Sequence, residues 1–397
     1  MKKKLKIPKD VVAVIAKLQD AGFEAYVVGG AIRDLLLNRK PKDFDLSTSA
    51  TPEQIRKLFT KKRAKIIGRR FQIIHLYLSD DVVEITTFRK APKDGKGKKA
   101  CDKKKPKEML FRDNDFGTSF EDAFRRDFTA NALFYDPIKE EIIDHTGQGL
   151  DDIEKGIVRV IGEPDLRLDE DPVRILRGLK LVGQYGFELE DKTKESILKK
   201  LDLITHIPAG RKLLELEKIL KSPYGCKILI TLQEYGYLKF YMPNLSRKWN
   251  KPEMNKSLKV YNAICKRVKN GNYRNSISLS MAAILYPLIE AEMSRKKVEF
   301  WDVENSAKFA IKSIGGSVFK DFQFSKWIKD AAFRIIEMLP YFVEEEPDKL
   351  LFQRKKYNHA RELITVLNDL FWNDKHLMKK WPKMMMKKEQ KNSNWFR

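Results

Sequence analysis

The chain has 397 residues, enough for two to four domains, since domains usually hold about 100 to 200 residues. Its 79 lysines and arginines outnumber its 55 aspartates and glutamates, which gives a formal net charge of +24. Such a surplus indicates a polyanionic partner, either nucleic acid or an anionic membrane surface. A single small module is excluded by the length.

Several classes of protein are disfavoured by what the sequence lacks. No apolar run reaches the roughly 18 residues of a membrane span, and the stretch MKKKLKIPKD leads into an amphipathic segment. We therefore expect no membrane span and a cytoplasmic location. The three cysteines form no CxxC pair, which fits a reducing compartment. Neither GxxxxGK[ST] nor HExxH occurs, which argues against a P-loop NTPase and a zincin.

The chain changes character near its middle. Helices are predicted at 9–21, 31–37 and 51–59, and strands at 24–28, 44–48, 65–68, 72–78 and 82–88. From about residue 165 onward a 3.6-residue apolar rhythm dominates. We therefore predict an α+β fold, with a small mixed β-sheet and helices in an N-terminal head and an all-helical neck, body and tail after it.

Two basic segments stand apart from these elements. Residues 89–107 hold ten lysines and arginines against two aspartates and are expected not to pack. Residues 351–397 hold twelve lysines and arginines against four acidic residues, interleaved with Trp372, Trp381 and Trp395. Both segments could bind RNA phosphates, and solvated surface charge is the alternative.

A candidate phosphate site follows the first predicted strand, at 24–28. In YVVGGAIRDLLL, Gly29 and Gly30 allow a tight turn, and a helix begins at about Ala31. The free N–H groups at a helix N-terminus can receive phosphate. Two glycines before a helix are weak support when taken alone.

Two aspartates in KPKDFDLSTS provide a candidate metal site. On a strand, Asp43 and Asp45 would share one face, about 7 Å apart at Cα, so both carboxylates could reach Mg²⁺. A charged strand edge is the alternative. Glu84, on another predicted strand, could add a carboxylate, although an outward-facing glutamate explains it equally well. Metal pairs of this kind support phosphoryl transfer, with one ion activating a hydroxyl and another holding the triphosphate.

Two further motifs carry charged residues that suit nucleotide recognition. The first, EDAFRRDFTANAL, contains Arg125, Arg126, Asp127 and Asn131. Asp127 could bind metal or orient an arginine, and the arginines could clamp a triphosphate through paired hydrogen bonds.

The second motif, DEDPVRILRGLK, contains Glu170, Asp171, Arg174 and Arg177. Asp171 before Pro172 suits a helix N-cap, which is its purely structural explanation. A fixed carboxylate beside an arginine could instead read the amino group and ring nitrogen that adenine and cytosine share. Guanine and uracil would leave such buried groups unpaired and would be rejected.

In this order, GGAIRD, DFD, RRDFTANAL and EDPVRILR resemble the motifs of the class II tRNA nucleotidyltransferase and bacterial poly(A) polymerase family, over residues 26 to about 187. The resemblance implies a nucleotidyltransferase head at 1–145, a helical neck that binds RNA and nucleotide at 146–245, and a helical body with a basic RNA-binding tail at 246–397.

The resemblance also implies roles for individual residues. It makes Asp43 and Asp45 the metal ligands for Mg²⁺, and adds Asp127 to them as a catalytic residue. The expected nucleotide-binding residues are Gly29, Gly30, Arg33, Arg126, Asn131, Asp171, Arg174 and Arg177. Lys180 departs from the family, which usually has a third arginine in RILRxxR.

The poly(A) polymerase branch is favoured by IIGRRFQIIHLYL, which contains Arg69, Arg70, Phe71 and His75, and by FRDNDFG before RRD. We predict that the chain adds AMP from ATP to the 3′ ends of mRNA or tRNA, as a monomer. A CCA-adding enzyme using CTP and ATP is the alternative. A non-catalytic RNA-binding protein is disfavoured because binding alone requires neither the DFD pair nor EDPVR.

Overall fold

The computed structural model describes residues 1–68, 72–78, 81–90, 116–295, 316–343 and 351–381. Arg69, Arg70, Phe71 and Trp395 lie outside these residues, as do most of the basic segment 89–107 and most of FRDNDFG. The described chain forms two compact units, Met1–His206 and Ile207–Arg397. Each unit is described by itself.

Unit 1 is built on a seven-stranded sheet of order β3-β4-β5-β2-β1-β6-β7. Its strands are β1 Ala25–Val28, β2 Asp45–Thr48, β3 Ala64–Ile67, β4 Ile73–Tyr77, β5 Val82–Thr87, β6 Leu133–Asp136 and β7 Glu141–Asp144. The β2–β5 pair is parallel and the other neighbours are antiparallel. The small mixed sheet predicted from the sequence is confirmed.

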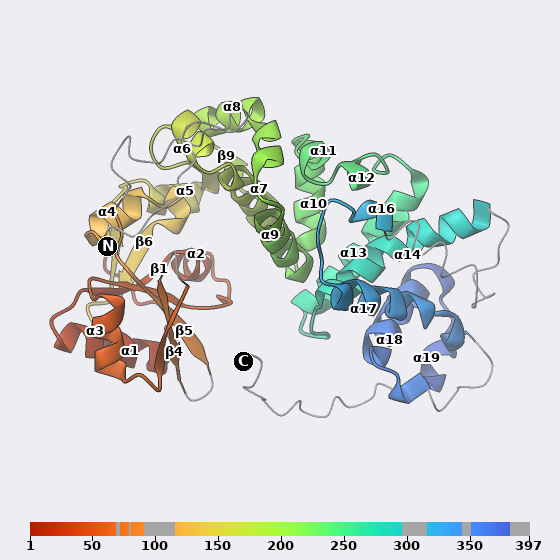
Figure 1. Ribbon diagram of the computed structural model, residues 1–397, viewed down its shortest axis with the longest axis horizontal. Coiled ribbons are helices and arrows are strands. Elements are labelled where there is room, and N and C mark those ends of the chain that lie inside the picture. Colours follow the sequence, from red (N-terminus) through yellow and green to blue (C-terminus); the bar gives the residue numbers. More distant parts are fainter. Residues whose placement is uncertain (69–71, 79–80, 91–115, 296–315, 344–350, 382–397) are drawn as a thin grey trace. The chain divides into compact units, whose positions relative to one another are not determined.

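The helices of unit 1 lie between and after these strands (Figure 1). They are α1 Lys9–Asp20, α2 Gly30–Leu36, α3 Pro52–Phe59, α4 Ser119–Phe124, the 3-10 turn η1 Thr129–Asn131, α5 Gly149–Lys155, α6 Pro164–Glu170, α7 Val173–Tyr185, α8 Asp191–Lys199 and the 3-10 helix η2 Leu201–His206. A second sheet, which the sequence did not predict, pairs β8 Ile157–Val158 with β9 Glu188–Leu189.

Local sequence explains where several of these helices begin and end. Thr51 caps α3 by accepting from Gln54 N, with Pro52 in the first turn, and Thr118 caps α4 in the same way. Helix α7 ends at Tyr185 and is capped by Gly186, whose φ of 75° is accessible to glycine at little cost.

The apolar residues of unit 1 are buried on both faces of the sheet. Helices α1 and α3 pack against strands β1, β3 and β4. Val28, Phe88 and Phe134 form a cluster with Ala123 of α4. Since paired residues on neighbouring strands point to the same side, Val28 shares its face with Asp45. Helix α4 therefore covers part of the face that carries Asp45.

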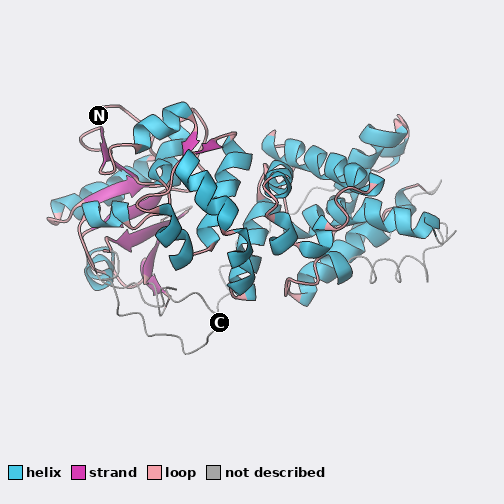
Figure 2. Ribbon diagram, turned by 90° about the horizontal axis from the view of Figure 1, so that it is seen from above, coloured by secondary structure: helices cyan, strands magenta, loops and turns pink. Residues whose placement is uncertain are grey.

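All described regular elements of unit 2 are helices, and Figure 2 shows the strands confined to unit 1. Its elements are α9 Ala209–Lys221, α10 Gly225–Glu234, α11 Leu238–Tyr241, α12 Pro243–Ser246, α13 Pro252–Lys269, α14 Ile277–Arg295, α16 Gly316–Val318, α17 Lys326–Glu337, η4 Pro340–Phe342, η5 Leu351–Gln353, α18 Tyr357–Leu367, the π-helical turn η6 Asn368–Trp372 and α19 Leu377–Lys380. The predicted change to an all-helical body is confirmed.

Two features of unit 2 bear on the sequence expectations. Trp381 is fully buried and donates from Nε1 to Phe342 O at 2.8 Å, so it serves the core and is not available to RNA. Helix α14 is the one described helix long and apolar enough to cross a membrane. Because 78% of its apolar window is buried inside the protein, it has the character of a core helix.

Candidate functional site

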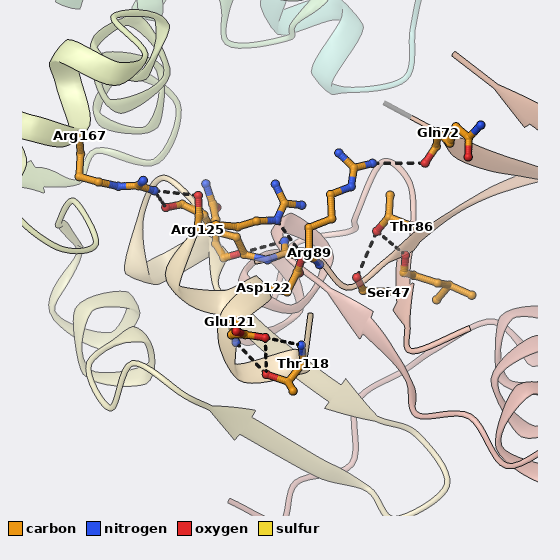
Figure 3. Close-up of polar contacts among 12 residues, drawn as sticks. Ser47, Gln72, Thr86, Arg89, Thr118, Glu121, Asp122, Arg125 and Arg167 are labelled. Atoms are coloured by element: carbon orange, nitrogen blue, oxygen red, sulfur yellow. Dashed lines mark hydrogen bonds and ion pairs between the residues drawn. The ribbon is translucent and has the colours of Figure 1, made fainter. Parts of the chain in front are cut away.

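The site is centred on the start of strand β2. Asp45 pairs with Val28 at the end of β1, next to Gly29. On its other side, β2 pairs with β5 in the register Ser47 to Thr86, and these two hydroxyls lie 3.1 Å apart (Figure 3). Two residues earlier on each strand, the same face carries Asp45 and Glu84. The strand register therefore brings Glu84 beside the predicted metal pair.

The Asp43–Asp45 pair differs in one detail from the expectation. Strand β2 begins at Asp45, so Asp43 lies in the preceding loop, where its carboxylate pairs with Lys42 Nζ at 3.2 Å. A shared strand face does not by itself hold the two side chains together. The two carboxylates are nevertheless close enough for the charge of Asp43 to act on Asp45.

The surroundings of Asp45 disfavour the charged form of its carboxyl group. Although solvent reaches this residue, partial burial by the surrounding protein raises its pKa to about 6. The negative charges of Asp43 and Glu84 act in the same direction, and Arg126 and Lys42 oppose them. Carboxylates in this arrangement repel one another unless a positive charge binds between them.

Within the described part of the chain, no three His, Cys, Asp or Glu side chains form a ready metal-binding group. Mg²⁺ is commonly held by one or two carboxylates together with substrate phosphates and water. Asp43 and Asp45 fit that pattern better than a metal cage made by the protein alone.

Gly29 and Gly30 directly follow Val28, the residue that pairs with Asp45. Gly29 has a φ of 75° and precedes the first turn of α2. A Cβ added at Gly29 would come within 3.3 Å of Arg126 Nη1, and one at Gly30 within 3.2 Å of Arg33 Nη2. The backbone conformation at position 29 favours glycine, and an added Cβ would also crowd the end of the Arg126 side chain.

Arg126 is held in place by Asp122, a residue that the sequence reasoning did not single out. The Asp122 side chain is fully buried and accepts from Arg126 Nη2 and Arg125 Nε, each at 2.9 Å (Figure 3). Burial alone would raise the pKa of Asp122, but the charges and hydrogen bonds of Arg126 and Arg125 outweigh it and lower the pKa. The i to i+4 spacing of Asp122 and Arg126 was the signal available in the sequence.

The guanidinium of Arg126 retains capacity for a ligand. Among the described residues, its Nε is a buried nitrogen without a hydrogen-bond partner. Buried donors are usually satisfied, and in the same guanidinium it is Nη1 that lies beside the Gly29 turn. The donor chemistry suits an oxygen of a phosphate group.

Asn131 and Asp127 connect the arginines to one another. The Asn131 Oδ1 atom accepts from Arg33 Nη1, and its Nδ2 donates to Asp127 Oδ1 at 3.4 Å. Asp127 Oδ2 lies 3.6 Å from Arg177 Nη1. Four predicted site residues that are up to 144 positions apart in the chain therefore form one network.

Asp171 and Arg174 make a second set of contacts. Helix α7 begins at Val173, one residue later than predicted, and Asp171 Oδ1 accepts from Val173 N at 3.2 Å. Asp171 thus accepts from the first amide of the helix, although Pro172 and not Asp171 occupies the N-cap position. Arg174 is buried and donates to Glu170 Oε2 at 3.0 Å, while Arg167 donates to the same oxygen at 2.7 Å.

Arg167 extends this second set back to the RRD motif. Its Nη2 donates to the carbonyl oxygens of Arg125 and Arg126 at 2.7 and 2.8 Å (Figure 3). Glu170 therefore holds both Arg174 and the arginine that fixes the backbone around Arg126. The RRD and EDPVR motifs are structurally linked within unit 1.

Two histidines noted in the sequence have ordinary surroundings. His75 lies on β4 with its Nε2 3.6 Å from Glu84 Oε1. His145 lies in the turn after β7, as predicted, between the rings of Phe120 and Phe134. Burial lowers the pKa of His145, which favours its neutral form.

Comparison with known proteins agrees with this geometry. A family described as the Poly A polymerase head domain matches residues 25–159, and one described as the probable RNA and SrmB-binding site of polymerase A matches residues 186–248. The chain belongs to the family of bacterial poly(A) polymerases and CCA-adding enzymes.

Individual relatives come from both branches of that family. The chain is 36% identical to Poly(A) polymerase I of Escherichia coli over 288 residues, which are 72% of this chain and 61% of that protein. It is 40% identical to Poly(A) polymerase I of Haemophilus influenzae over 245 residues, 62% of this chain and 54% of the relative. It is 37% identical to the CCA-adding enzyme of a Geobacillus species over 237 residues, 60% and 55% respectively. The matches thus span about three fifths of the curated relatives' length.

A solved structure shares the fold. The CCA-adding enzyme of Bacillus stearothermophilus in complex with CTP is 25% identical, with a TM-score of 0.59, and the match covers 91% of this chain and 78% of that one. The predicted α+β head followed by a helical region is the architecture that this comparison supports.

Proposed function

We propose that this protein is a template-independent polynucleotide adenylyltransferase, which adds AMP from ATP to RNA 3′ ends and releases pyrophosphate. The proposal rests on one observation. The three carboxylates of Asp43, Asp45 and Glu84 act on one another beside the Gly29 turn, where Arg126 also lies. Such a site combines negative charge for metal ions with donors for a triphosphate. The identity of 36 to 40% with two Poly(A) polymerase I relatives favours adenylate as the product.

Each part of the site has a role in this proposal. Asp43 and Asp45 would hold Mg²⁺, which when bound supplies charge neutralisation at the triphosphate and activation of the RNA 3′ hydroxyl. Asp127 acts with them by orienting Arg177 and Asn131. Gly29, Gly30, Arg33 and Arg126 receive the phosphates, since their N–H donors surround the start of α2.

Base selection is assigned to Asp171 and Arg174. The carboxylate would accept from the amino group of adenine while the arginine donates to the ring nitrogen, and guanine and uracil would leave both unpaired. Glu170 supports the proposal because it fixes Arg174 through a charge-assisted hydrogen bond at 3.0 Å. A cytoplasmic location and RNA contact by the basic surface of the chain complete the proposed function.

CCA addition is the second candidate, favoured by the similarity of about 37% to a CCA-adding enzyme and by the shared fold with another. Purified protein with Mg²⁺ should be given ATP alone, CTP alone or both, with an oligo(A) primer or a tRNA that lacks CCA. Long tails made from ATP on both RNAs are expected. Addition that stops after three nucleotides, and only on the tRNA, would assign the second function.

One further pair of variants distinguishes the proposed catalytic function from a non-catalytic RNA-binding role. Asp43→Ala or Asp45→Ala should abolish incorporation while RNA binding persists, because the carboxylates add nothing to phosphate affinity. Asp151→Ala, which removes an exposed carboxylate paired with Lys155, is the matched control and should keep full activity. Equal incorporation by the wild type and both site variants would reject the proposed metal site.

A further inference from the structure

The last residue of helix α7, Tyr185, has contacts that none of the sequence motifs anticipate. Its hydroxyl accepts from Arg33 Nη2 at 2.5 Å and from Gln184 Nε2 at 2.9 Å. The same hydroxyl donates to Asp34 Oδ1 at 2.6 Å. Burial raises the pKa of Tyr185, so the phenol keeps the proton that it donates.

The ring of Tyr185 also contacts two guanidinium groups. The Arg33 guanidinium carbon lies 4.3 Å from the ring centroid, and that of Arg39 lies 4.6 Å from it. Cations over an aromatic face are attracted by its quadrupole, and arginine is the residue most often found there. The Arg33 side chain is therefore fixed by both the ring and the hydroxyl of one tyrosine.

Arg33 is also the point at which α7 joins the phosphate turn. From Arg33 the hydrogen bonds continue to Asn131, then to Asp127, and from Asp127 the ion pair returns to Arg177. Arg177 and Tyr185 lie on the same helix, eight residues or about 12 Å apart. These contacts and the backbone of α7 form a closed loop, and Tyr185 belongs to it without being part of any of the four sequence motifs.

We propose that Tyr185 is a positioning residue for nucleotide binding, which fixes the Arg33 guanidinium toward the phosphate turn at Gly29 and Gly30. This inference rests on the proposed function, because it takes the triphosphate of ATP as the ligand of Arg33. A long arginine side chain that is already ordered loses less freedom when the nucleotide binds. Asp34, which Arg33 Nε and Nη2 contact at 3.1 and 2.8 Å, supports the same orientation.

The first test replaces Tyr185 by phenylalanine. Tyr185→Phe keeps the ring over the guanidiniums and removes the three hydroxyl bonds. The expected result is a rise of about five- to tenfold in the KM for ATP, with kcat and the KM for an oligo(A) primer within about twofold of wild type. Tyr135→Phe is the matched control, since the buried Tyr135 hydroxyl accepts from Leu5 N at 3.0 Å, away from the network.

A double-mutant cycle asks whether Tyr185 acts through Arg33. Arg33→Lys keeps the charge and loses the planar fork. In the Arg33→Lys background, Tyr185→Phe should change the KM for ATP by less than about twofold, because its partner is gone. Effects that multiply, or an unchanged KM for ATP in Tyr185→Phe, would overturn the inference and leave the adenylyltransferase proposal standing.

Equilibrium binding separates the two proposals from each other. If the wild-type protein binds ATP but incorporates none, the proposed function is rejected. The inference about Tyr185 would then still require that Tyr185→Phe weaken ATP binding about five- to tenfold. Wild-type protein that does not bind ATP would overturn the inference. If thermal unfolding shows that Tyr185→Phe does not fold, Asp34→Asn should give the same rise in the KM for ATP, and a normal KM would again overturn it.

Discussion

Replacing Asp45 by asparagine should stabilise the metal-free protein while abolishing its activity. Partial burial, followed by the charges of Asp43 and Glu84, raises the pKa of Asp45 to about 6. Below about pH 4 the carboxyl of Asp45 is protonated in both the folded and the unfolded chain, so it does not lower the stability of the folded state. As the pH rises from about 4 to 6, the unfolded chain releases its proton first, so the folded state loses stability.

The magnitude follows from the same pKa. A rise from 3.8 to about 6 corresponds to roughly 3 kcal/mol at neutral pH, at about 1.4 kcal/mol for each pH unit. Solvent reaches Asp45 and screens its charge, so we expect Asp45→Asn to raise the free energy of unfolding by about 1 to 2 kcal/mol. For a folding unit of about 200 residues, this difference would raise Tm by roughly 2 to 8 °C.

Thermal unfolding followed by circular dichroism would measure this difference. At pH 8 in EDTA, Asp45→Asn should have a higher Tm than wild type, and the gain should vanish near pH 4. Added Mg²⁺ should raise the Tm of wild type more than that of the variant. Asp151→Asn, at an exposed carboxylate, should leave Tm within about 1 °C of wild type. A lower Tm for Asp45→Asn, or an equal response of both proteins to Mg²⁺, would refute the reasoning.

Three other predictions concern the arginines, the glycine turn and the body. Asp122→Asn should lower kcat/KM for ATP by about 10- to 100-fold, because Arg126 loses a buried ionic partner; steady-state kinetics with near-normal values would contradict this. Gly29→Ala should raise the KM for ATP, because its φ is 75° and the new Cβ would lie 3.3 Å from Arg126 Nη1. Gly22→Ala, with φ of 86° and open space around the Cβ, should show similar strain by urea unfolding with an unchanged KM. Trp381→Ala should destabilise unit 2 by about 3 to 5 kcal/mol in urea unfolding, since a fully buried indole leaves a cavity, and a smaller loss would mean that the site collapses around it.

Much of the fold was predictable because its signals are local. The apolar spacing of α1 and the capping residues Thr51 and Thr118 are determined within a few neighbouring positions. The order of the four motifs also pointed to the family, which the comparisons confirm. The short pairing of β8 with β9 was missed because two-residue strands have no usable periodicity.

The sequence also suggested the carboxylates and arginines of the site, while their arrangement was decided by tertiary structure. The parallel pairing of β2 with β5 brings Glu84 to Asp45, and no local pattern specifies which strands become neighbours. The basic tail offered Trp381 as an RNA contact, but packing against Phe342 buries it.

Residue types and spacing therefore determined which chemical groups this protein carries. Only the tertiary structure decided which groups meet. Tyr185 and Arg33 are separated by 152 positions, and their hydrogen bond exists because α7 returns to the start of α2. Contacts between distant segments depend on the packing of whole elements, and a single sequence contains no local signal for them.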